Sequence, residues 1–231
     1  MDLNGKVVVI TGAYSGLGRA LSEQFAGKGC KLVLAGRDDK KLASFTKEIG
    51  DITDAASVIT DIRSEKDCQH MIDYAVKKFG RVDLLVNNAG VWEPGSADDV
   101  TEKQLKAVFE TNVFGTAYCS KYAARRMKKQ GKGIIVNIAS TAGIDYKTNL
   151  IAYSASKHAI VGFTGSMSEE LKGTEIKILC FCPGGIKTGL YRKYPKINAN
   201  EYMEPNFVAQ HLIRHIENPS EEWLIVLRRP K

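Results

Sequence analysis

Seven short apolar runs recur along the chain. They read KVVVI, KLVLA, SVIT, VDLLV, GIIVNI, IKILCF and WLIVL. Their hydrophobicity is nearly continuous rather than alternating, which is typical of strands that are covered on both faces in a parallel sheet. Segments of helical period lie between most of these runs, at residues 17–26, 40–49, 68–79, 105–127, 155–171 and 207–216. The pattern therefore predicts strands that alternate with helices.

This alternation predicts an α/β fold with right-handed crossovers, in which the helices cover both faces of the sheet. We expect a doubly wound, seven-stranded and mainly parallel sheet. No repeat, low-complexity tract or change in composition interrupts the pattern. A chain of 231 residues with 44% hydrophobic residues also fits one globular domain. We therefore expect a single domain over residues 1–231.

The glycine-rich and small polar clusters follow the predicted strands. In chain order they are TGAYSGLG, GR, DI, NNAG, ASTAG and PGGIKTG. In doubly wound sheets, ligands bind outside the carboxyl ends of the strands. Six strand ends therefore meet at one crevice, and a purely structural protein has no reason to gather its irregular segments there.

The first of these clusters has the spacing T-G-x-x-x-G-x-G, follows a strand and opens a helix. Gly12, Gly16 and Gly18 would permit a tight turn, close approach of the backbone to a ligand and close helix packing. An ordinary strand-to-helix turn is the alternative interpretation. We favour a loop that holds a dinucleotide diphosphate, and we include its other members, Tyr14, Ser15 and Leu17, in the predicted site.

The end of the second strand predicts which dinucleotide binds. NAD-binding proteins usually carry an acidic residue there, whereas this chain has Gly36 followed by Arg37. A guanidinium can bind a 2′-phosphate in bidentate fashion, so we expect NADP(H) rather than NAD. Asp61, followed by Ile62, ends the third strand. Its carboxylate could accept a hydrogen bond from the adenine amino group or cap the helix entered at Ser64.

The composition of the chain limits the classes of partner that we expect it to bind. The net charge is +7, but basic residues are spread along the chain among acidic ones, so we expect no nucleic acid. An anionic cofactor explains the charge equally well. No apolar stretch approaches a membrane span, and the segment that begins at Met1 lacks the layout of a cleavable signal. We therefore expect a cytoplasmic protein that does not enter the membrane.

The metal-binding residue types form no complete set. The five cysteines are scattered and odd in number, which is typical of reduced core thiols. His211 and His215 have the i, i+4 spacing of a helical metal site, but no nearby carboxylate or cysteine completes it. We expect no metal.

The sequence YSASK contains Tyr153 and Lys157, which should project from one helical face. Such a pair is by itself usually a solvated surface feature. A free phenol has a pKa of about 10, and a neighbouring ammonium favours the phenolate and lowers that value. The pair could therefore tune an acid.

The order and intervals of these motifs resemble the short-chain dehydrogenase/reductase family in its compact, non-extended form. The resemblance covers almost the whole chain, and several motifs in register are harder to produce by chance than one. The matching segments are TGAYSGLG, Asp61, NNAG at 87–90, Asn112, Ser140 in IVNIASTAG, YSASK and PGGIKT at 183–188. The resemblance implies a Rossmann domain and the reversible, NADP-dependent reduction of a small-molecule carbonyl to an alcohol.

The resemblance implies four catalytic residues. Tyr153 is expected to be the acid, and Ser140 to donate to the substrate oxygen. Lys157 is expected to bind the nicotinamide ribose, and Asn112 to hold a water that connects the lysine to solvent. Each residue also has a structural interpretation: Ser140 could end a strand, Asn112 could satisfy backbone groups, and Tyr153 could pack at the crevice edge.

The resemblance also extends the cofactor site. Asn87, Ala89 and Gly90 are expected to line its adenosine side. The segment with Pro183, Gly184, Ile186 and Thr188 is expected to contact the nicotinamide carboxamide, through the Ile186 backbone and the Thr188 hydroxyl.

A short substrate lid is expected at about residues 189–205. Its apolar and basic residues would suit a medium apolar carbonyl compound or one with an anionic group. A mobile, solvated loop whose aromatic residues pack on the body is an equal alternative. The residues in question are Leu190, Tyr191, Arg192, Lys193, Tyr194, Lys196 and Ile197.

Two further partners follow from the resemblance. Lys128, Lys129 and Lys172 fall where 3-oxoacyl-acyl-carrier-protein reductases present basic residues to an acyl carrier protein, which makes that activity the narrower alternative. Helices near 105–129 and 154–172 are expected to form a homodimer or homotetramer through positions such as Val113, Ala117, Ala159 and Phe163. A non-catalytic dinucleotide-binding sensor or scaffold is the alternative from another class.

Overall fold

The computed structural model describes residues 1–191, 194, 198–218 and 220–229. The strands are β1 (Val7–Thr11), β2 (Lys31–Gly36), β3 (Ala55–Ile59), β4 (Leu84–Asn87), β5 (Lys132–Ile138), β6 (Glu175–Pro183) and β7 (Leu224–Leu227). The α-helices are α1 (Gly16–Gly27), α2 (Asp39–Gly50), α3 (Glu65–Phe79), α4 (Glu102–Val108), α5 (Thr116–Gln130), α6 (Ile151–Glu170) and α7 (Pro205–Glu217). A π-helical segment, η1 (Phe109–Gly115), joins α4 to α5, and three short 3-10 turns complete the fold: η2 (Thr141–Gly143), η3 (Gly189–Tyr191) and η4 (Ala199–Glu201).

The seven predicted strands form one sheet in the order β3-β2-β1-β4-β5-β6-β7. Every strand pair in the described part of the chain is parallel. The order reverses at β1, so the chain winds outward in both directions from that strand. The predicted doubly wound fold is confirmed, and the sheet is fully rather than mainly parallel within the described residues.

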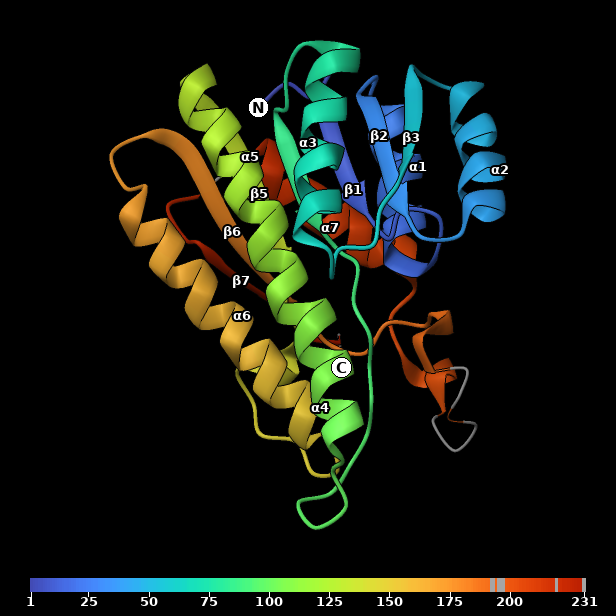
Figure 1. Cartoon of the computed structure of the whole chain (residues 1–231), viewed down its shortest axis with the longest axis vertical. Helices are drawn as coiled ribbons and strands as arrows, with labels where there is room; N and C mark the ends of the chain where they lie inside the picture. The colour runs from blue at the N-terminus through green and yellow to red at the C-terminus, as the bar shows by residue number, and fades with distance from the viewer. Residues whose placement is uncertain (192–193, 195–197, 219, 230–231) are drawn as a thin grey trace.

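Helices cover both faces of the sheet. Figure 1 shows α3, α5 and α6 in front of the strands and α7 behind them. Side chains of β1 alternate between the two sides: Val8 and Ile10 enter the core that contains Phe25 of α1, whereas Val9 enters the core that contains Met71 of α3. Because both faces are buried, the strand needs apolar residues at every position, which explains its continuous hydrophobic pattern.

The helix ends follow local capping chemistry. The Asp38 side chain accepts from the backbone of Lys41 at the start of α2, and Ser64 caps α3 in the same way. Helix α3 ends at Gly80, whose φ of 81° is a left-handed conformation that favours glycine. These caps place the helix starts at the carboxyl edge of the sheet.

The helical pattern over residues 105–127 corresponds to α4, η1 and α5 rather than to one regular helix. The π-helical turn widens the helix where Gly115 packs against Ile62, since a Cβ on Gly115 would lie 2.7 Å from the Ile62 side chain. A π-helical turn changes the direction in which the side chains after it point. Asn112 therefore lies in an irregular turn, which apolar periodicity does not reveal.

Candidate active site

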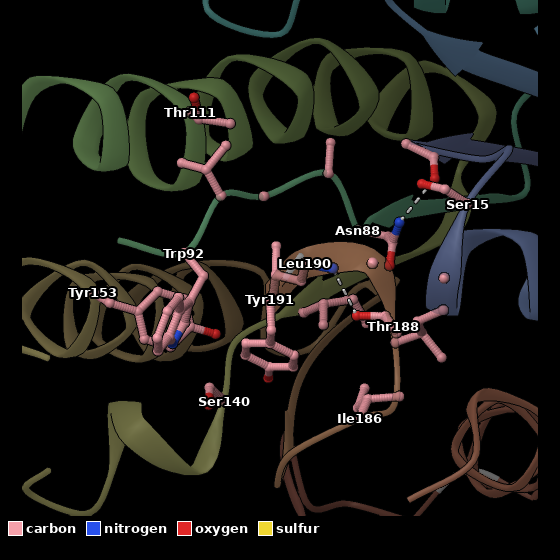
Figure 2. Close-up of a pocket in the computed structure, with 18 of the residues that line it drawn as sticks. Ser15, Asn88, Trp92, Thr111, Ser140, Tyr153, Ile186, Thr188, Leu190 and Tyr191 are labelled. Carbon is pink, nitrogen blue, oxygen red and sulfur yellow. Dashed lines mark hydrogen bonds between the residues drawn. The ribbon is translucent and has the colours of Figure 1, made fainter. Parts of the chain in front are cut away.

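A cavity of about 1100 Å³ lies at the carboxyl edge of the sheet. Loops that follow β1 to β6 contribute to its wall, as the positions of the glycine-rich clusters predicted. Figure 2 shows Ser15 and Asn88 toward one end of this cavity and Ser140, Tyr153 and Trp92 toward the other.

The glycine-rich loop forms the floor of the first end. Tyr14, Ser15 and Leu17 line the cavity together with Gly12 and Gly16. Gly16 has a φ of 53°, and a Cβ there would lie 3.0 Å from the Thr188 side chain. A larger residue at this position would therefore be both strained and crowded.

Gly18 does not line the cavity, although we predicted it in the cofactor site. A Cβ at this position would lie 2.2 Å from the Gly12 carbonyl oxygen. Its role is therefore to let α1 pack closely against the turn that precedes it. This is the helix-packing function that the motif predicted for one of its glycines.

The start of α1 fits the diphosphate of a dinucleotide. Ser15 is the N-cap residue, yet its side chain makes no capping hydrogen bond, and the first turn carries no acidic side chain. Side chains cap α2, α3 and α4, whereas α6 and α7 lack a side-chain cap as α1 does. The backbone amides at the start of α1 can therefore donate to an anion that approaches through the cavity.

The adenosine end carries positive charge. Arg37 and Lys41 line the cavity beside Gly36. A Cβ on Gly36 would lie 2.4 Å from the ring of Tyr14, so this ring occupies the space that an acidic side chain at position 36 would need. The residue that usually binds the ribose hydroxyls of NAD is thus absent for a steric reason as well as a chemical one.

Asp61 and Ile62 also line the cavity. Nε of Arg63 lies 3.0 Å from both carboxylate oxygens of Asp61, and this ion pair holds the pKa of Asp61 below its ordinary value. Of the two interpretations of Asp61, the capping one is wrong, because Ser64 is the N-cap residue of α3. A role toward adenine stays a prediction.

The predicted role of Asn87 is wrong, and its neighbour Asn88 takes that place. Asn87 is buried, and its Nδ2 donates to Ser120 Oγ at 2.9 Å and to Asn137 Oδ1 at 2.8 Å within the core. Asn88 lines the cavity and donates through Nδ2 to the Thr11 carbonyl at 2.9 Å. Asn87 is the last residue of β4 and points into the sheet layer, so the next residue faces the crevice.

Ala89 and Gly90 line the cavity as predicted. At the end of β6, the cavity is lined by Pro183, Gly184, Ile186 and Thr188, which confirms their position but does not test their predicted contacts. The Thr188 hydroxyl accepts from the Leu190 backbone at 3.3 Å. Gly185 lines the same wall and was not predicted.

Tyr153 and Lys157 meet Ser140 at the second end. Both residues lie on α6, and Ser140 follows β5 and caps the η2 turn through its hydroxyl. All three line the cavity. Nζ of Lys157 donates to the Ile138 carbonyl at 2.8 Å and lies 5.7 Å from the centroid of the Tyr153 ring. The structure therefore brings the phenol, the ammonium and the serine together.

Burial sets the pKa values of this pair. Desolvation raises the pKa of Tyr153 to about 12, although a hydrogen bond with the Ser140 side chain lowers it. Desolvation lowers the pKa of Lys157 to about 8. The pKa of Tyr153 in the protein alone therefore lies above its ordinary value, contrary to the expectation for a phenol beside an ammonium, because the loss of hydration outweighs the hydrogen bond with Ser140.

Asn112 does not line the cavity, although the neighbouring Thr111 does. Its Oδ1 accepts from the Val91 backbone at 2.8 Å, and its Nδ2 donates to the Val91 carbonyl at 3.0 Å and to Ser156 Oγ at 3.1 Å. The side chain thus fixes the loop after β4 against α6. Its predicted link to a water stays a prediction.

The expected lid contains the turns η3 and η4, and its aromatic residues pack on the body of the protein. Tyr191 and Tyr194 both contact Trp92, which follows β4. Such packing is what the solvated-loop alternative also expects of the aromatic residues, so a substrate lid stays a prediction. Arg192, Lys193, Lys196 and Ile197, also predicted for the lid, lie outside the described residues.

The sequence interpretation missed several residues of the second end. Trp92, Pro94, Leu150 and Tyr202 line the cavity there. Trp92 and Pro94 lie just beyond the NNAG motif, so their position shortly after a strand end could have indicated that they line the cavity. Leu150 and Tyr202 come from loops whose course the strand pattern does not predict.

The lysines predicted to meet an acyl carrier protein lie at the opposite edge of the sheet, where α5 and α6 end. Lys128 pairs with Glu170 at 3.3 Å, and Lys172 pairs with Glu169 at 3.2 Å. Lys129 is exposed beside them. None of the three lysines lines the cavity.

Three further observations bear on the predicted partners. Within the described residues, no helix is long and apolar enough to cross a membrane, and no three metal-binding side chains come together. The five cysteines are unpaired thiols and all are buried. Val113, Ala117, Ala159 and Phe163 are half-buried in the single chain, so they do not test the predicted oligomer.

This combination of a parallel sheet, a glycine-rich turn and a Ser-Tyr-Lys set is that of a nucleotide-dependent oxidoreductase. The sequence model described as short chain dehydrogenase matches residues 6–198, so the chain belongs to that family. An uncharacterized oxidoreductase of Staphylococcus saprophyticus is 32% identical over 222 residues, which cover 95% of this chain and 94% of the relative.

Solved structures agree with this assignment. A short chain dehydrogenase/reductase from Burkholderia phymatum, in complex with NAD, has a TM-score of 0.92 at 30% identity and covers 98% of this chain and 90% of its own. A variant of actinorhodin polyketide ketoreductase with NADPH has a TM-score of 0.89 at 28% identity and covers 97% and 95%. Similar proteins thus bind either nucleotide, and the comparison does not choose between them.

Proposed function

We propose that this oxidoreductase reduces a carbonyl group to an alcohol, reversibly, with NADPH as cofactor and Tyr153 as the acid. The observation that carries the proposal is the meeting of Ser140, Tyr153 and Lys157 at one end of a single cavity. The other end of that cavity holds an uncapped helix start and two cationic side chains. A cofactor that spans the two ends would present its nicotinamide to the tyrosine.

Each of the three residues has a distinct task. The hydroxyls of Ser140 and Tyr153 would donate to the substrate oxygen, which gains negative charge during reduction. Tyr153 Oη would then release its proton to that oxygen. The ammonium of Lys157 favours the resulting phenolate, because opposite charges attract strongly in buried surroundings. When bound, the cofactor supplies the hydride.

The preference for NADPH rests on Arg37 and on Gly36. A guanidinium at the end of β2 suits a 2′-phosphate, and Tyr14 leaves no room at position 36 for an acidic side chain. We expect NADPH to have a lower KM than NADH. We also expect Arg37→Asp to reverse the order, because a carboxylate repels the 2′-phosphate and can accept from ribose hydroxyls. A wild-type protein that prefers NADH would disprove the cofactor assignment.

Consumption of NADPH, followed at its absorbance maximum with a panel of carbonyl compounds, tests the reaction itself. Tyr153→Phe should abolish turnover and retain cofactor binding, because it removes only the hydroxyl. The competing proposal of a dinucleotide sensor predicts no turnover with any carbonyl compound and an unchanged cofactor affinity in Tyr153→Phe. The two proposals therefore differ in the wild-type protein, in which only the enzyme consumes NADPH, and Tyr153→Phe then assigns that turnover to the phenol.

The oligomeric state, the cellular location and the binding of a carrier protein are also part of the proposal. We propose a homodimer or homotetramer built on α5 and α6, which sedimentation would test. We place the protein in the cytoplasm, where its five unpaired thiols would stay reduced. If it acts on an acyl carrier protein bound at Lys128, Lys129 and Lys172, the carrier would serve the cavity of a neighbouring copy.

A further inference from the structure

An aromatic cluster covers the catalytic end of the cavity. Trp92 lies edge-on to the ring of Tyr153, with 6.5 Å between the ring centroids. It makes closer edge contacts with Tyr191 at 5.2 Å and with Tyr194 at 4.9 Å. In Figure 2, Trp92 and Tyr153 overlap, with the Tyr191 ring and Ser140 beside them. We call Trp92, Tyr153, Tyr191, Tyr194 and Tyr202 the aromatic cluster.

The cluster joins two loops above Tyr153. The Tyr194 hydroxyl hydrogen-bonds to the Glu93 carboxylate, so the lid is tied to the loop after β4. Tyr202 supports Tyr191 from the lid side at 5.2 Å. Trp92 is only 8% exposed and Tyr153 equally so. A substrate that reaches Tyr153 must therefore lie against Trp92 or displace it.

Within the described residues, apolar side chains add to the wall at this end, and neutral polar side chains lie among them. The apolar ones are Pro94, Ala142, Leu150 and Leu190, and the polar ones are Thr141, Thr148 and Asn149. Burial raises the pKa of Tyr191 and, less strongly, that of Tyr194, so both phenols stay uncharged at neutral pH.

Charged side chains line both ends of the cavity in the described part of the chain. Arg37, Lys41 and Asp61 lie at the adenosine end, and Lys147 and Lys157 lie at the catalytic end. Lys157 belongs to the catalytic set, and Lys147 lies 3.5 Å from Asp145. A substrate group that occupies the aromatic cluster therefore has little to gain from a negative charge.

We propose that the substrate is a neutral carbonyl compound with a flat ring next to the carbonyl group, such as an aryl ketone, and that Trp92 selects it. This inference rests on the proposed carbonyl reduction. A flat ring can lie against the Trp92 ring in edge-to-face contact, which stabilises aromatic pairs beyond simple burial. A flexible chain of equal size forms no such contact and loses more rotational freedom on binding.

Acetophenone and 2-octanone make a matched test, because both are methyl ketones of the same carbon number and only one has a ring. We expect wild type to have the higher kcat/KM for acetophenone. Trp92→Leu should lower the ratio of the two kcat/KM values by about two- to twelvefold, as expected for the loss of one aromatic contact. Trp92→Phe should retain most of the preference. A variant that loses activity equally with both ketones would show a merely structural role and overturn the inference.

Fluorescence provides a readout that does not depend on turnover. The chain has two tryptophans, and Trp223 packs against Gly165 outside the cavity. In Trp223→Phe, Trp92 is the sole emitter. With NADP⁺ present, so that no hydride is available, acetophenone should quench this emission saturably and 2-octanone should not. The matched control, Trp92→Phe, keeps Trp223 and should show no saturable quenching.

The outcomes separate the two proposals. If no carbonyl compound is reduced but acetophenone still quenches Trp92, the proposed reaction is wrong and the proposed binding of a flat ring against Trp92 stands. If carbonyl compounds are reduced but 2-octanone is preferred, the proposed binding of a flat ring against Trp92 is wrong and the proposed reaction stands. The same conclusion follows if carbonyl compounds are reduced but acetophenone gives no saturable quenching. Should Trp92→Leu fail to fold, Trp92→Phe and the fluorescence of Trp223→Phe still decide.

Discussion

Replacement of Lys157 by methionine should make the protein more stable and inactive. The ammonium of Lys157 is buried, with one described hydrogen bond, to the Ile138 carbonyl. Burial lowers its pKa from the ordinary 10.5 to about 8. The folded state therefore binds a proton less tightly than the unfolded chain does, and stability rises with pH between these two values. Methionine has a similar length and carries no charge.

The size of the effect follows from the two pKa values. At pH 7, keeping the buried ammonium costs the folded state about 3 kcal/mol. At pH 9.5 the buried lysine is already neutral, and the cost falls to about 1.4 kcal/mol, which is that of deprotonating an ordinary lysine. Loss of the hydrogen bond to Ile138 removes about 1 kcal/mol at either pH.

Urea unfolding of the cofactor-free protein, followed by circular dichroism, measures this difference. Lys157→Met should be more stable than wild type by about 2 kcal/mol at pH 7 and nearly equal to it at pH 9.5. The change between the two pH values does not depend on how well methionine packs. Lys66→Met, on the exposed side of α3, is the control and should vary by less than about 0.5 kcal/mol. A variant that is less stable than wild type by the same amount at both pH values would refute the reasoning.

Three further substitutions test the supporting structure. Gly36→Ser should lose about 1–3 kcal/mol in urea unfolding and raise the KM for NADPH, because its Cβ meets the Tyr14 ring; adding Tyr14→Ala should restore stability. Asn112→Ala should lose about 1–3 kcal/mol and lower kcat, since two backbone groups of Val91 lose their partner; unchanged unfolding would contradict this. Ser64→Ala should cost about 1 kcal/mol in thermal unfolding with kcat/KM unchanged, because it removes only the cap of α3.

The fold could be predicted because its signals are local and repeated. Each strand is an apolar run that needs no partner to be recognised, and a fully covered parallel sheet demands such runs. The π-helical turn at Phe109–Gly115 could not be predicted in this way. Gly115 of this turn packs closely against Ile62, and the two residues belong to segments far apart in the sequence. Periodicity within one helix carries no information about such a contact.

The difference between Asn87 and Asn88 shows a second limit. The NNAG motif places two asparagines at the end of β4, and either could face the cavity from the sequence alone. One residue of register decides, because successive side chains of a strand point to opposite sides. The structure puts Asn87 into a network with Ser120 and Asn137, and these partners come from α5 and β5.

The pKa of Tyr153 shows why the chemistry of the site is harder to predict than the set of residues that form it. Helical spacing places Lys157 one turn from the phenol, and an ammonium at that spacing should lower the pKa of the phenol. The opposing effect, desolvation, depends on what covers the ring. Trp92 contributes to that cover from the loop after β4, and Tyr191 contributes from the lid. Because the cover is aromatic and neutral, it raises the pKa of Tyr153 in the protein alone and offers a contact surface to a flat substrate. Both consequences have one cause, so a substitution of Trp92 that changes the substrate preference should also shift the pH dependence of Tyr153.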